Sequence, residues 1–484
     1  MPGGLFILVA YGAQDIALTG NPTENFFKYH SVTHTHFAKE PVILTPTKTV
    51  DTPDKNKTTE LRFQLKRVGD FIHGANLLLT LPSLAVSDES PYEIRWAKYP
   101  GLAIIDEMRA IVGGTEVQTL DRDTMFSIMK MDMEDEQRVI YEDMVGNVNE
   151  LVDPANGAYT PLLGGYPYIG LSDTFSLPER QLCIPTLFWF TRAIQESLPV
   201  GFLTLHEAEI VIKLAPWSRL IQVCPRNSVL SVQWTSPPSD FNIKDYIVSY
   251  SGNWELNPRL ECIYYFLSDD ERMSMARQEI KVPVFRMRKY IEHTERPGVR
   301  SYYTDPSGNF IYTNNLTKTD NTTITLKQEG NPVRRLLTLA RRRDYLENND
   351  WTRFGNWQFG DIGRDLSTGD IYSYKDNIIE SFTFKMNGNI ILDEMKSCYM
   401  NRYDQYEFSR GRGYDGLWSY SFGVKNEECR SKGTLNLGRV RDPEINIKVT
   451  PTNVSPSVYS VLVMVECINW FVYTSGHAGL VYAT

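Results

Sequence analysis

Hydrophobic and polar positions alternate over many short stretches of the chain. Leu61, Phe63 and Leu65 alternate with charged and amide side chains, and the same period of two returns at residues 208–214 and 445–449. In a strand, the side chains of residues i and i+2 point to the same face of the sheet. Each stretch therefore predicts a strand with one buried and one solvated face, and turn residues separate the stretches.

One stretch has the spacing of a helix instead. Asp121 is suited to cap it, and Met125, Ile128 and Met129 fall at positions i, i+3 and i+4. We interpret these methionines as core residues. The acidic run that follows, residues 131–143, is interpreted as the solvated face of a helix.

A break in the strand pattern falls at Pro237–Pro238, because adjacent prolines continue neither a sheet ladder nor a helix. We therefore predict a first domain of residues 36–236 and a second of residues 237–484. An N-terminal segment, residues 1–35, precedes the first clear strand.

The two predicted domains contain a faint internal repeat. Residues 108–129 and 382–400 each read as a strand, a tight turn with glycine, a second strand and a helical stretch. A chain of 484 residues is long enough for two or three domains. Two copies of one β-sandwich in tandem are the simplest interpretation, and the predicted class is all-β with a few short helices.

Composition narrows the function classes. The chain is 42% hydrophobic and 23% charged, which is ordinary for a globular protein. Its net charge of −9 argues against a nucleic-acid coat, because neutralising phosphates needs a basic face. The six cysteines are scattered and form no CxxC pair, so we expect reduced thiols, although an even count leaves disulfides open. The apolar run Leu5–Ala10 is too short for a signal peptide or a membrane span.

Two histidines and a glutamate form a candidate metal site. His34 and His36 share one face of an extended strand with Glu40 close by, an arrangement that could hold a transition metal. The same spacing is the core of the metal motif of cupins, a jelly-roll enzyme superfamily. That motif needs glycines where Lys28 and Thr47 stand, and a second histidine motif is missing. We therefore predict polar strand residues here and no metal.

Two other motifs have plain interpretations. Residues 411–416 match GxGxxG, but a helical stretch precedes them and a strand follows, the reverse of a dinucleotide-binding motif, so we interpret them as a flexible turn. Arg334, Arg335 and Arg341–Arg343 form one basic cluster. Such a cluster can bind nucleic acid or form ion pairs with an acidic neighbouring subunit. The negative net charge favours the ion pairs. Nothing assembles a nucleophile, a base and an orienting group, so we predict no catalytic residue and no cofactor.

The N-terminal stretch also carries a family resemblance. The segments Gly12–Asp15, Leu18–Pro22 and Phe27–Lys28, followed by His34-Thr35 and Phe37, resemble the opening of the major capsid proteins of nucleocytoplasmic large DNA viruses. In that pattern His36 stands where the family usually has Asn. The likeness to a cupin is therefore interpreted as accidental.

Three further blocks resemble the same family, namely residues 182–214, 417–449 and 468–482. His206 lies at a position where the family pattern has His or Tyr. The departures from the pattern are Thr186, Ser431-Lys432, Leu437, Gly438 and His477, the last in place of Met. Because the blocks spread from the first residues to the last, the resemblance is specific to the family, while the departures leave the virus lineage open.

The resemblance implies a fold and an assembly. Members of this family fold as two consecutive eight-stranded jelly rolls, a double jelly roll, and three copies form a pseudo-hexagonal capsomer. By this resemblance the chain is a structural protein of the icosahedral capsid of a giant virus, a homotrimer assembled in the host cytoplasm and located in the virion. Its expected partners are neighbouring capsomers, minor capsid and penton proteins and the internal membrane side of the capsid, without direct nucleic-acid binding. The alternatives were a carbohydrate-binding jelly-roll lectin and an enzyme.

Loops and the N-terminal segment complete the expectations. Residues 143–180 and 286–322 would form outer towers. Asn315 and Asn321 are glycosylation sequons there, although assembly in the cytoplasm avoids the usual glycosylation machinery. Residues 1–35 contain the apolar run Leu5–Ala10 and Phe26–Phe27, which a solvated tail would not carry, and little positive charge, so we predict a docking arm on the inner side of the capsomer.

Overall fold

The structure is a computed structural model of the chain. The described residues fall into two compact units, Met1–Phe37 and Ala38–Thr484. The structure describes residues 3–482 with the exception of residues 11, 30–32, 49, 51, 88–90, 153–173, 226–233, 249–252, 297–299, 305–309, 315–320, 327–330, 356–377, 412, 425–432 and 450–456.

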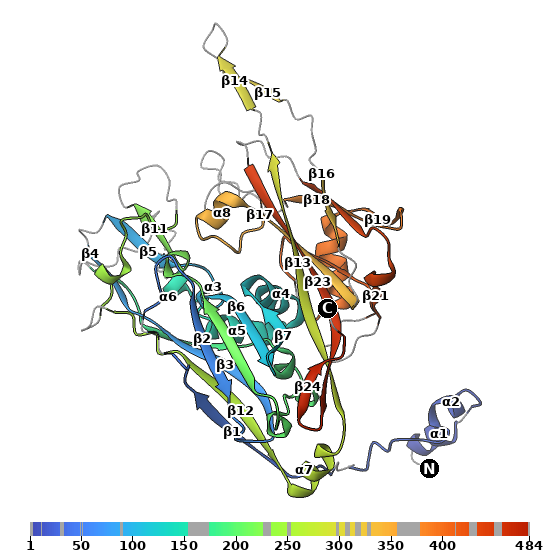
Figure 1. Cartoon of the computed structure of the whole chain (residues 1–484). Helices are drawn as coiled ribbons and strands as arrows, with labels where there is room; N and C mark the ends of the chain where they lie inside the picture. Colours follow the sequence, from blue (N-terminus) through green and yellow to red (C-terminus); the bar gives the residue numbers. More distant parts are fainter. Residues whose placement is uncertain are drawn as a thin grey trace. The chain divides into compact units, whose positions relative to one another are not determined.

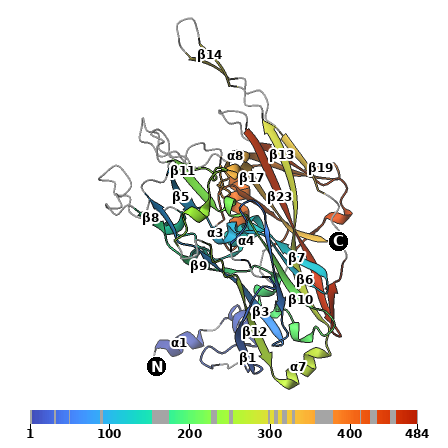
Figure 2. The same ribbon diagram turned by 60° about the vertical axis from the view of Figure 1, so that its left-hand side comes forward.

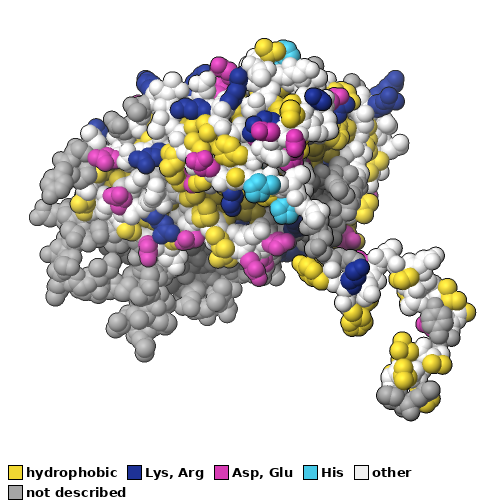
Figure 3. Space-filling model, turned by 90° about the horizontal axis from the view of Figure 1, so that it is seen from below, with side chains coloured by type: hydrophobic (Ala, Val, Ile, Leu, Met, Phe, Trp, Pro, Cys, Tyr) yellow, Lys and Arg dark blue, Asp and Glu magenta, His cyan; other side chains and the backbone are white. Residues whose placement is uncertain are grey.

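The N-terminal unit contains two short helices, α1 (Gly3–Val9) and α2 (Asp15–Thr19), and no described side chain of either helix is buried. The large apolar side chains of α1 are 44% to 78% exposed, and Figure 3 shows hydrophobic side chains on the surface of this segment. Helices this short are marginal in water without a surface to pack against. None of the described helices of the chain is long and apolar enough to cross a membrane.

A first β-sandwich is built from two four-stranded sheets. Their strand orders are β1–β12–β3–β9 and β2–β10–β6–β7, so neighbours in space are distant in sequence, as in a jelly roll. The strands are β1 (Phe37–Leu44), β2 (Thr59–Leu65), β3 (Phe71–Leu81), β6 (Ile105–Val112), β7 (Thr115–Leu120), β9 (Arg180–Pro185), β10 (Ala208–Leu214) and β12 (Arg259–Leu267).

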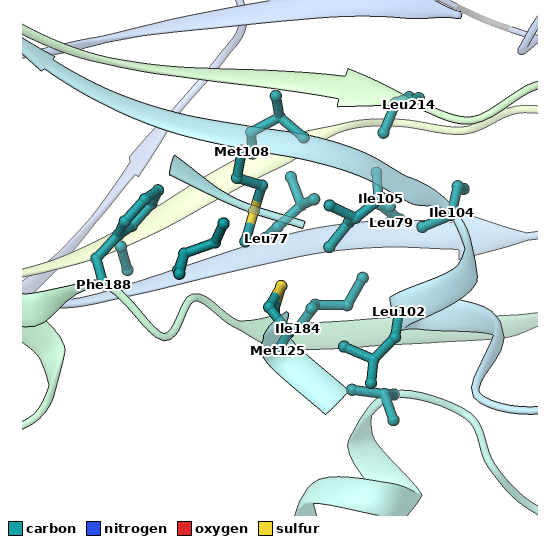
Figure 4. Close-up of a cluster of buried hydrophobic side chains, with 14 of the residues drawn as sticks. Leu77, Leu79, Leu102, Ile104, Ile105, Met108, Met125, Ile184, Phe188 and Leu214 are labelled. Atoms are coloured by element: carbon teal, nitrogen blue, oxygen red, sulfur yellow. The ribbon is translucent and has the colours of Figure 1, made fainter. Parts of the chain in front are cut away.

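The alternating pattern explains the core of this sandwich. Leu77 and Leu79 of β3 lie in one cluster with Ile105 and Met108 of β6, all fully buried (Figure 4). The predicted strands at residues 59–65 and 208–214 are confirmed as β2 and β10, which pair with each other in an antiparallel ladder. Their charged residues point away from the core.

Shorter elements connect these strands. Two small ladders, β4–β8 and β5–β11, flank the sandwich. The elements are β4 (Leu84–Ser87), β5 (Tyr92–Trp96), α3 (Pro100–Ala103), α4 (Arg122–Asp132), α5 (Asp135–Met144), α6 (Asn149–Val152), β8 (Thr174–Leu177), η3 (Trp189–Thr191), η4 (Ile194–Glu196), η5 (Val200–Phe202), η6 (Trp217–Arg219), β11 (Ile221–Pro225), η7 (Ile243–Asp245) and α7 (Asp269–Ala276).

A second sandwich repeats the order of the first. Its sheets run β13–β23–β17–β20, with β21 and β24 at the side, and β16–β22–β18–β19. Both sandwiches thus have the strand order of a jelly roll, and the predicted all-β double jelly roll is confirmed (Figures 1 and 2). The elements are β13 (Ile280–Arg296), β14 (Arg300–Thr304), β15 (Phe310–Asn314), β16 (Asn321–Thr325), β17 (Pro332–Arg342), α8 (Arg343–Glu347), β18 (Ile379–Met386), β19 (Asn389–Met395), η8 (Tyr399–Tyr403), α9 (Asp404–Phe408), β20 (Leu417–Ser421), β21 (Leu435–Asn436), η9 (Leu437–Arg439), β22 (Glu444–Val449), β23 (Ser457–Thr474) and β24 (His477–Leu480).

The internal repeat is confirmed by equivalent elements. β6, β7 and α4 follow one another in the first sandwich, as β18, β19 and the helical turns η8 and α9 do in the second. Each hairpin turns on residues with positive φ, Gly113 and Gly114 in the first and Asn387 and Gly388 in the second. Such turns need φ > 0, which glycine and asparagine tolerate best.

The strand order bears on the division between the domains. β12 (Arg259–Leu267) lies beyond Pro237–Pro238, yet it pairs with β3 and completes a sheet of the first sandwich. A division at residue 237 would separate β12 from that sheet. We therefore propose a later division, within residues 268–279, where α7 connects β12 to β13.

The predicted loops are only partly loops. Residues 286–296, expected in a tower, belong to β13 and pair with β23, so the prediction is wrong for them. Beyond them β14 and β15 form a two-stranded ribbon, drawn past the upper ends of β13 and β17 in Figure 1. In the other predicted tower, residues 149–152 are helical and residues 153–173 lie outside the described residues. The tower role stays a prediction.

No disulfide joins the cysteines that the structure describes, which are Cys183, Cys224, Cys262, Cys398 and Cys467. Burial raises the pKa of the Cys262 thiol to about 12, so this side chain is a neutral core residue. The expectation of reduced thiols is confirmed for these residues, and Cys429 lies outside the described part of the chain.

Candidate functional site: the jelly-roll interface

One sheet of the second jelly roll is buried on both faces. On β23, Val461, Val463 and Val465 pack into the second sandwich, whereas Leu462 and Met464 belong to the core cluster of the first. Successive side chains of a strand point to opposite faces, so one face of this sheet lies against the first jelly roll. Figures 1 and 2 both show α4 beside it. We call this contact the jelly-roll interface.

Helix α4 (Arg122–Asp132) supplies most of the first jelly roll's side. Asp121 caps it, because an oxygen of its carboxylate accepts the backbone N–H of Thr124 at 3.0 Å. Met125 and Ile128 are buried, as their spacing predicts. The predicted helix is confirmed, and its charged side chains reach across to the second jelly roll.

Arg335 of β17 is the central residue of the interface. Its two terminal nitrogens donate to the two carboxylate oxygens of Asp132 at 2.6 and 2.7 Å. Its Nε lies 2.6 Å from a carboxylate oxygen of Glu466 on β23. The Arg335 side chain is fully buried. The bidentate pair with Asp132 thus joins β17 of the second jelly roll to α4 of the first. The contact with Glu466 joins the same guanidinium to β23.

The buried charges compensate one another. Burial acts to raise the pKa of Asp132, but Arg335 and Arg334 outweigh it and hold that pKa below its usual value. Glu466 behaves alike, with its pKa lowered by Arg334 and Arg335 against the effect of burial. For Arg335, burial lowers the pKa but the two carboxylates raise it further. All of these groups therefore stay ionised while they are paired.

Two more ion pairs lie near the N-terminal end of α4. Arg341 of β17 donates to Asp123 at 2.6 Å, and Lys289 of β13 contacts the carboxylate of Asp121. Although burial acts to raise the pKa of Asp123, Arg341 and Arg122 lower it well below its usual value. Carboxylates are also favoured at this end of a helix by its dipole.

Lys130 of α4 sits in an aromatic cage shared by both jelly rolls. Its Nζ donates to the Tyr99 hydroxyl at 2.9 Å and to Glu142 at 2.6 Å. The same nitrogen lies 5.1, 5.6 and 5.2 Å from the ring centroids of Tyr99, Phe126 and Tyr414. Burial lowers the pKa of Lys130, and the pair with Glu142 opposes that effect. Tyr414 comes from the second jelly roll, so the cage adds cation–π contacts across the interface.

The glycine-rich stretch at residues 411–416 docks on the end of α4. The Gly411 N–H donates to the Met131 carbonyl at 2.7 Å and the Gly413 N–H to the Lys130 carbonyl at 3.2 Å. A Cβ on Gly411 would lie 2.4 Å from the Lys130 carbonyl oxygen. The prediction of a flexible turn is therefore wrong, because these glycines allow close backbone packing.

The basic cluster also differs from its prediction. Arg334, Arg335, Arg341 and Arg342 are at most 6% exposed, so they form no surface patch for nucleic acid. Arg335 and Arg341 pair with carboxylates of their own chain, and the predicted pairing with a neighbouring subunit is wrong for them. Arg343 is exposed and pairs with Glu347 on the same helix.

The acidic run is only partly solvated. Asp135 is largely exposed, as expected, whereas Asp132 is the buried partner of Arg335. The sequence contains one signal for buried ion pairs. Glu466 is a lone carboxylate in a long apolar strand, and a buried carboxylate requires a cationic partner.

The predicted site residues are not brought into a catalytic arrangement. His34 is exposed, and its Nδ1 lies 2.8 Å from the Thr35 carbonyl oxygen, while Glu40 lies exposed on β1. Among the described residues, no three or more His, Cys, Asp or Glu side chains are grouped to hold a metal ion. Asn315 lies outside the described residues, and Asn321 begins β16, where its backbone pairs with Lys448. Glycosylation at either asparagine stays a prediction.

Comparison with protein families identifies the chain. Residues 25–250 match the family described as "Major capsid protein N-terminus", and residues 300–479 match "Large eukaryotic DNA virus major capsid protein". The chain belongs to the major capsid protein family of large eukaryotic DNA viruses. The predicted resemblance is confirmed.

Curated members of the major capsid protein family are similar over different lengths. The major capsid protein of Phaeocystis pouchetii virus is 30% identical over 57% of this chain and 51% of its own length. That of Paramecium bursaria Chlorella virus 1 is 23% identical over 92% of this chain and 87% of its own length. The chain thus spans about half the length of the first of these relatives and most of the second.

Solved capsid structures share the double jelly-roll fold. The PBCV-1 virus capsid protein superimposes with a TM-score of 0.69 at 17% identity, covering 95% of this chain and 100% of that one. The Faustovirus major capsid protein gives 0.64 at 12% identity, covering 95% and 94%. At these identities the likeness supports the fold alone.

Proposed function

We propose that this chain is the repeated building block of an icosahedral capsid, with three copies forming a pseudo-hexagonal capsomer. The observation that carries the proposal is the pair of jelly rolls with the same strand order, joined by an interface that contains buried ion pairs. Three such double blocks around one threefold axis present six similar sandwiches, and a nearly hexagonal prism of this kind tiles a plane.

The jelly-roll interface is suited to a lattice-forming block, because the angle between the two jelly rolls must be the same in every copy. Arg335 holds α4 through two hydrogen bonds to Asp132, and it holds β23 through an ion pair with Glu466. Interdomain contacts without such anchors commonly permit domain motion. A fixed angle between the two jelly rolls would give every copy the same outline, which a regular lattice requires.

The role proposed for the chain is structural and not enzymatic, and it includes no cofactor. Its proposed partners are neighbouring capsomers, minor capsid and penton proteins and the internal membrane side of the capsid, and its proposed location is the virion, after assembly in the host cytoplasm. Direct binding of nucleic acid is not part of the proposal. Basic and acidic side chains are interspersed on the face seen in Figure 3, which suits protein contacts better than a phosphate backbone.

Imaging of the purified full-length chain tests the proposal. Light scattering at micromolar concentration near neutral pH should give the mass of three copies, and negative-stain images should show pseudo-hexagonal particles about as wide as they are tall. A monomer under these conditions would contradict the capsomer. A small oligomer that binds sugar and forms no hexagonal particle would favour a lectin instead.

A further inference from the structure

Two histidines meet where the end of the second jelly roll touches the first. His206 precedes β10, and His477 is the first residue of β24. Nε2 of His206 lies 3.4 Å from Nδ1 of His477, and the ring centroids are 5.1 Å apart with planes at 77°. His206 is partly buried and His477 is exposed, so solvent reaches the pair.

The backbone on both sides holds His206 in place. Its Nδ1 lies 3.0 Å from the Ala478 carbonyl oxygen and 3.1 Å from the Ala478 nitrogen. A Cβ on Gly113 would lie 2.5 Å from the same Nδ1, and a Cβ on Gly476, which has φ of +82°, would lie 2.1 Å from the Thr204 hydroxyl. The missing side chain of Gly113 therefore leaves the space that this imidazole occupies.

This seating matches that of a metal-binding histidine. An imidazole that binds a metal through one nitrogen usually donates the N–H of the other to a backbone carbonyl, which orients the ring. In one tautomer of His206, Nδ1 accepts the Ala478 N–H, and in the other Nδ1 donates to the Ala478 carbonyl. The second tautomer leaves a lone pair on Nε2, which faces His477.

The separation of the two nitrogens fits a shared ion. Two ligands at about 2.0–2.1 Å from a tetrahedral zinc lie about 3.3–3.4 Å apart. Nε2 of His206 and Nδ1 of His477 are 3.4 Å apart.

We propose that His206 and His477 together bind one divalent transition-metal ion of the class that favours imidazole, such as Zn²⁺ or Cu²⁺. The ion would link the first jelly roll to β24. Among the described residues no third His, Cys, Asp or Glu completes the site, so water fills the remaining positions.

Metal titration of the full-length protein tests the site. After treatment with a chelator, the protein is titrated with Zn²⁺ at pH 7.5 in a calorimeter. We expect saturable uptake of one ion per chain, a rise in melting temperature with Zn²⁺, and at least a tenfold loss of affinity in His477→Met. The electron paramagnetic resonance spectrum of bound Cu²⁺ should show coupling to two imidazole nitrogens, a readout that needs no variant.

The matched control is the other close pair of histidines. A double variant, His34→Ala with His36→Ala, should bind Zn²⁺ as the parent does. The proposal is overturned if no saturable uptake occurs, if uptake survives in His477→Met, or if it is lost in the His34/His36 variant. It is overturned also if Cu²⁺ shows fewer than two nitrogen ligands, in which case the two rings share a proton and no metal.

Discussion

Two sheets of the molecule carry arginine–carboxylate pairs. On one sheet the pair faces water, and on the other it is buried in the interior. On the outer face of the sheet β2–β10–β6–β7, Arg62 lies 2.7 Å from Glu60, and both side chains are more than a third exposed. In the jelly-roll interface, Arg335 lies 2.6 Å from Asp132 and is fully buried. The two contacts have nearly the same length but very different surroundings.

The difference shows that location decides what an ion pair contributes. Water solvates both partners of an exposed pair and screens their attraction, so such a pair adds little to stability. Removing one partner of a buried pair leaves the other charge uncompensated in a medium of low dielectric constant. The outer charges keep one sheet face solvated, whereas the buried charges fix how the two jelly rolls pack.

Removing Arg335 should have the largest effect. Arg335→Ala leaves Asp132 buried without its cation and Glu466 with Arg334 alone, and we expect a loss of about 3–5 kcal/mol in the free energy of unfolding. Chemical denaturation with urea measures it. The matched control, Arg62→Ala, should leave the denaturation midpoint unchanged within error.

A second variant separates charge from shape. Replacing Arg335 by Met together with Asp132→Leu removes both partners of the bidentate pair, while Glu466 keeps its pair with Arg334. This variant should be clearly more stable than Arg335→Ala, because it leaves no carboxylate buried without a cation. If Arg335→Ala and Arg62→Ala change the midpoint equally, burial is not what distinguishes the two pairs and the comparison fails.

The next largest effect is expected from low pH, which should weaken the jelly-roll interface. The pKa values of Asp123, Asp132 and Glu466 are lowered in the folded chain, so the unfolded chain binds protons first as the pH falls. Their contribution is complete above the ordinary carboxyl values, near pH 4, and is lost as the pH falls through the lowered values. Asp404 acts in the opposite direction, because burial raises its pKa.

Urea midpoints measured between pH 6 and pH 3 give the slope of this loss. The variant with Arg335→Met and Asp132→Leu should show a shallower decline than the parent, because one of the three carboxylates is absent. An equal slope in both would assign the acid sensitivity to groups outside the interface.

Much of the fold was predictable because its signals are local. Alternation identified strands such as β2 and β10, and the repeat of hairpin and helix identified two equivalent sandwiches. A double proline suggested a division at residue 237, but β12 completes the first sandwich after it. Which sheet a strand joins depends on long-range pairing, which a local breaker does not encode.

The interface was harder to predict for the same reason. Asp132 and Arg335 are 203 residues apart, and nothing near either one names the other. The pattern around Gly411 indicated only conformational freedom, whereas the structure uses the missing side chain for close packing. Glu466 was the one usable signal, since a carboxylate in an apolar strand implies a buried cation but not which one.

A smaller effect on stability is expected at Gly411. Gly411→Ala places a Cβ against the Lys130 carbonyl, where backbone must move, and we expect a loss of about 1–3 kcal/mol, as for other overpacked sites. Thermal denaturation measures the change. Gly479→Ala is the control, because nothing lies within 4 Å of its added Cβ. A neutral Gly411→Ala would mean that the loop is only loosely attached to α4.

The smallest effect on stability is expected from the N-terminal segment, which exposes apolar residues rather than charges. Leu8, Leu18 and Phe27 are 76%, 87% and 100% exposed. Leaving such side chains in water is unfavourable by roughly 1.5–3 kcal/mol each when a site to bury them exists. Residues 1–37 form a compact unit of their own, apart from Ala38–Thr484. We propose that they dock on other components of the shell.

Deleting Pro2–Gly20 should therefore leave the melting temperature unchanged and the trimers soluble, while sheets or shells no longer form in electron micrographs. Changing Leu5, Ile7 and Leu8 to serine in the full-length chain should have the same result, because the apolar character and not the length of the segment makes the contact. A truncated chain that aggregates as unfolded monomer would place the segment in the core of the fold. Normal assembly of the truncated chain would remove the docking role. Unlike Arg335, whose loss should destabilise the building block itself, this segment should matter only when blocks assemble.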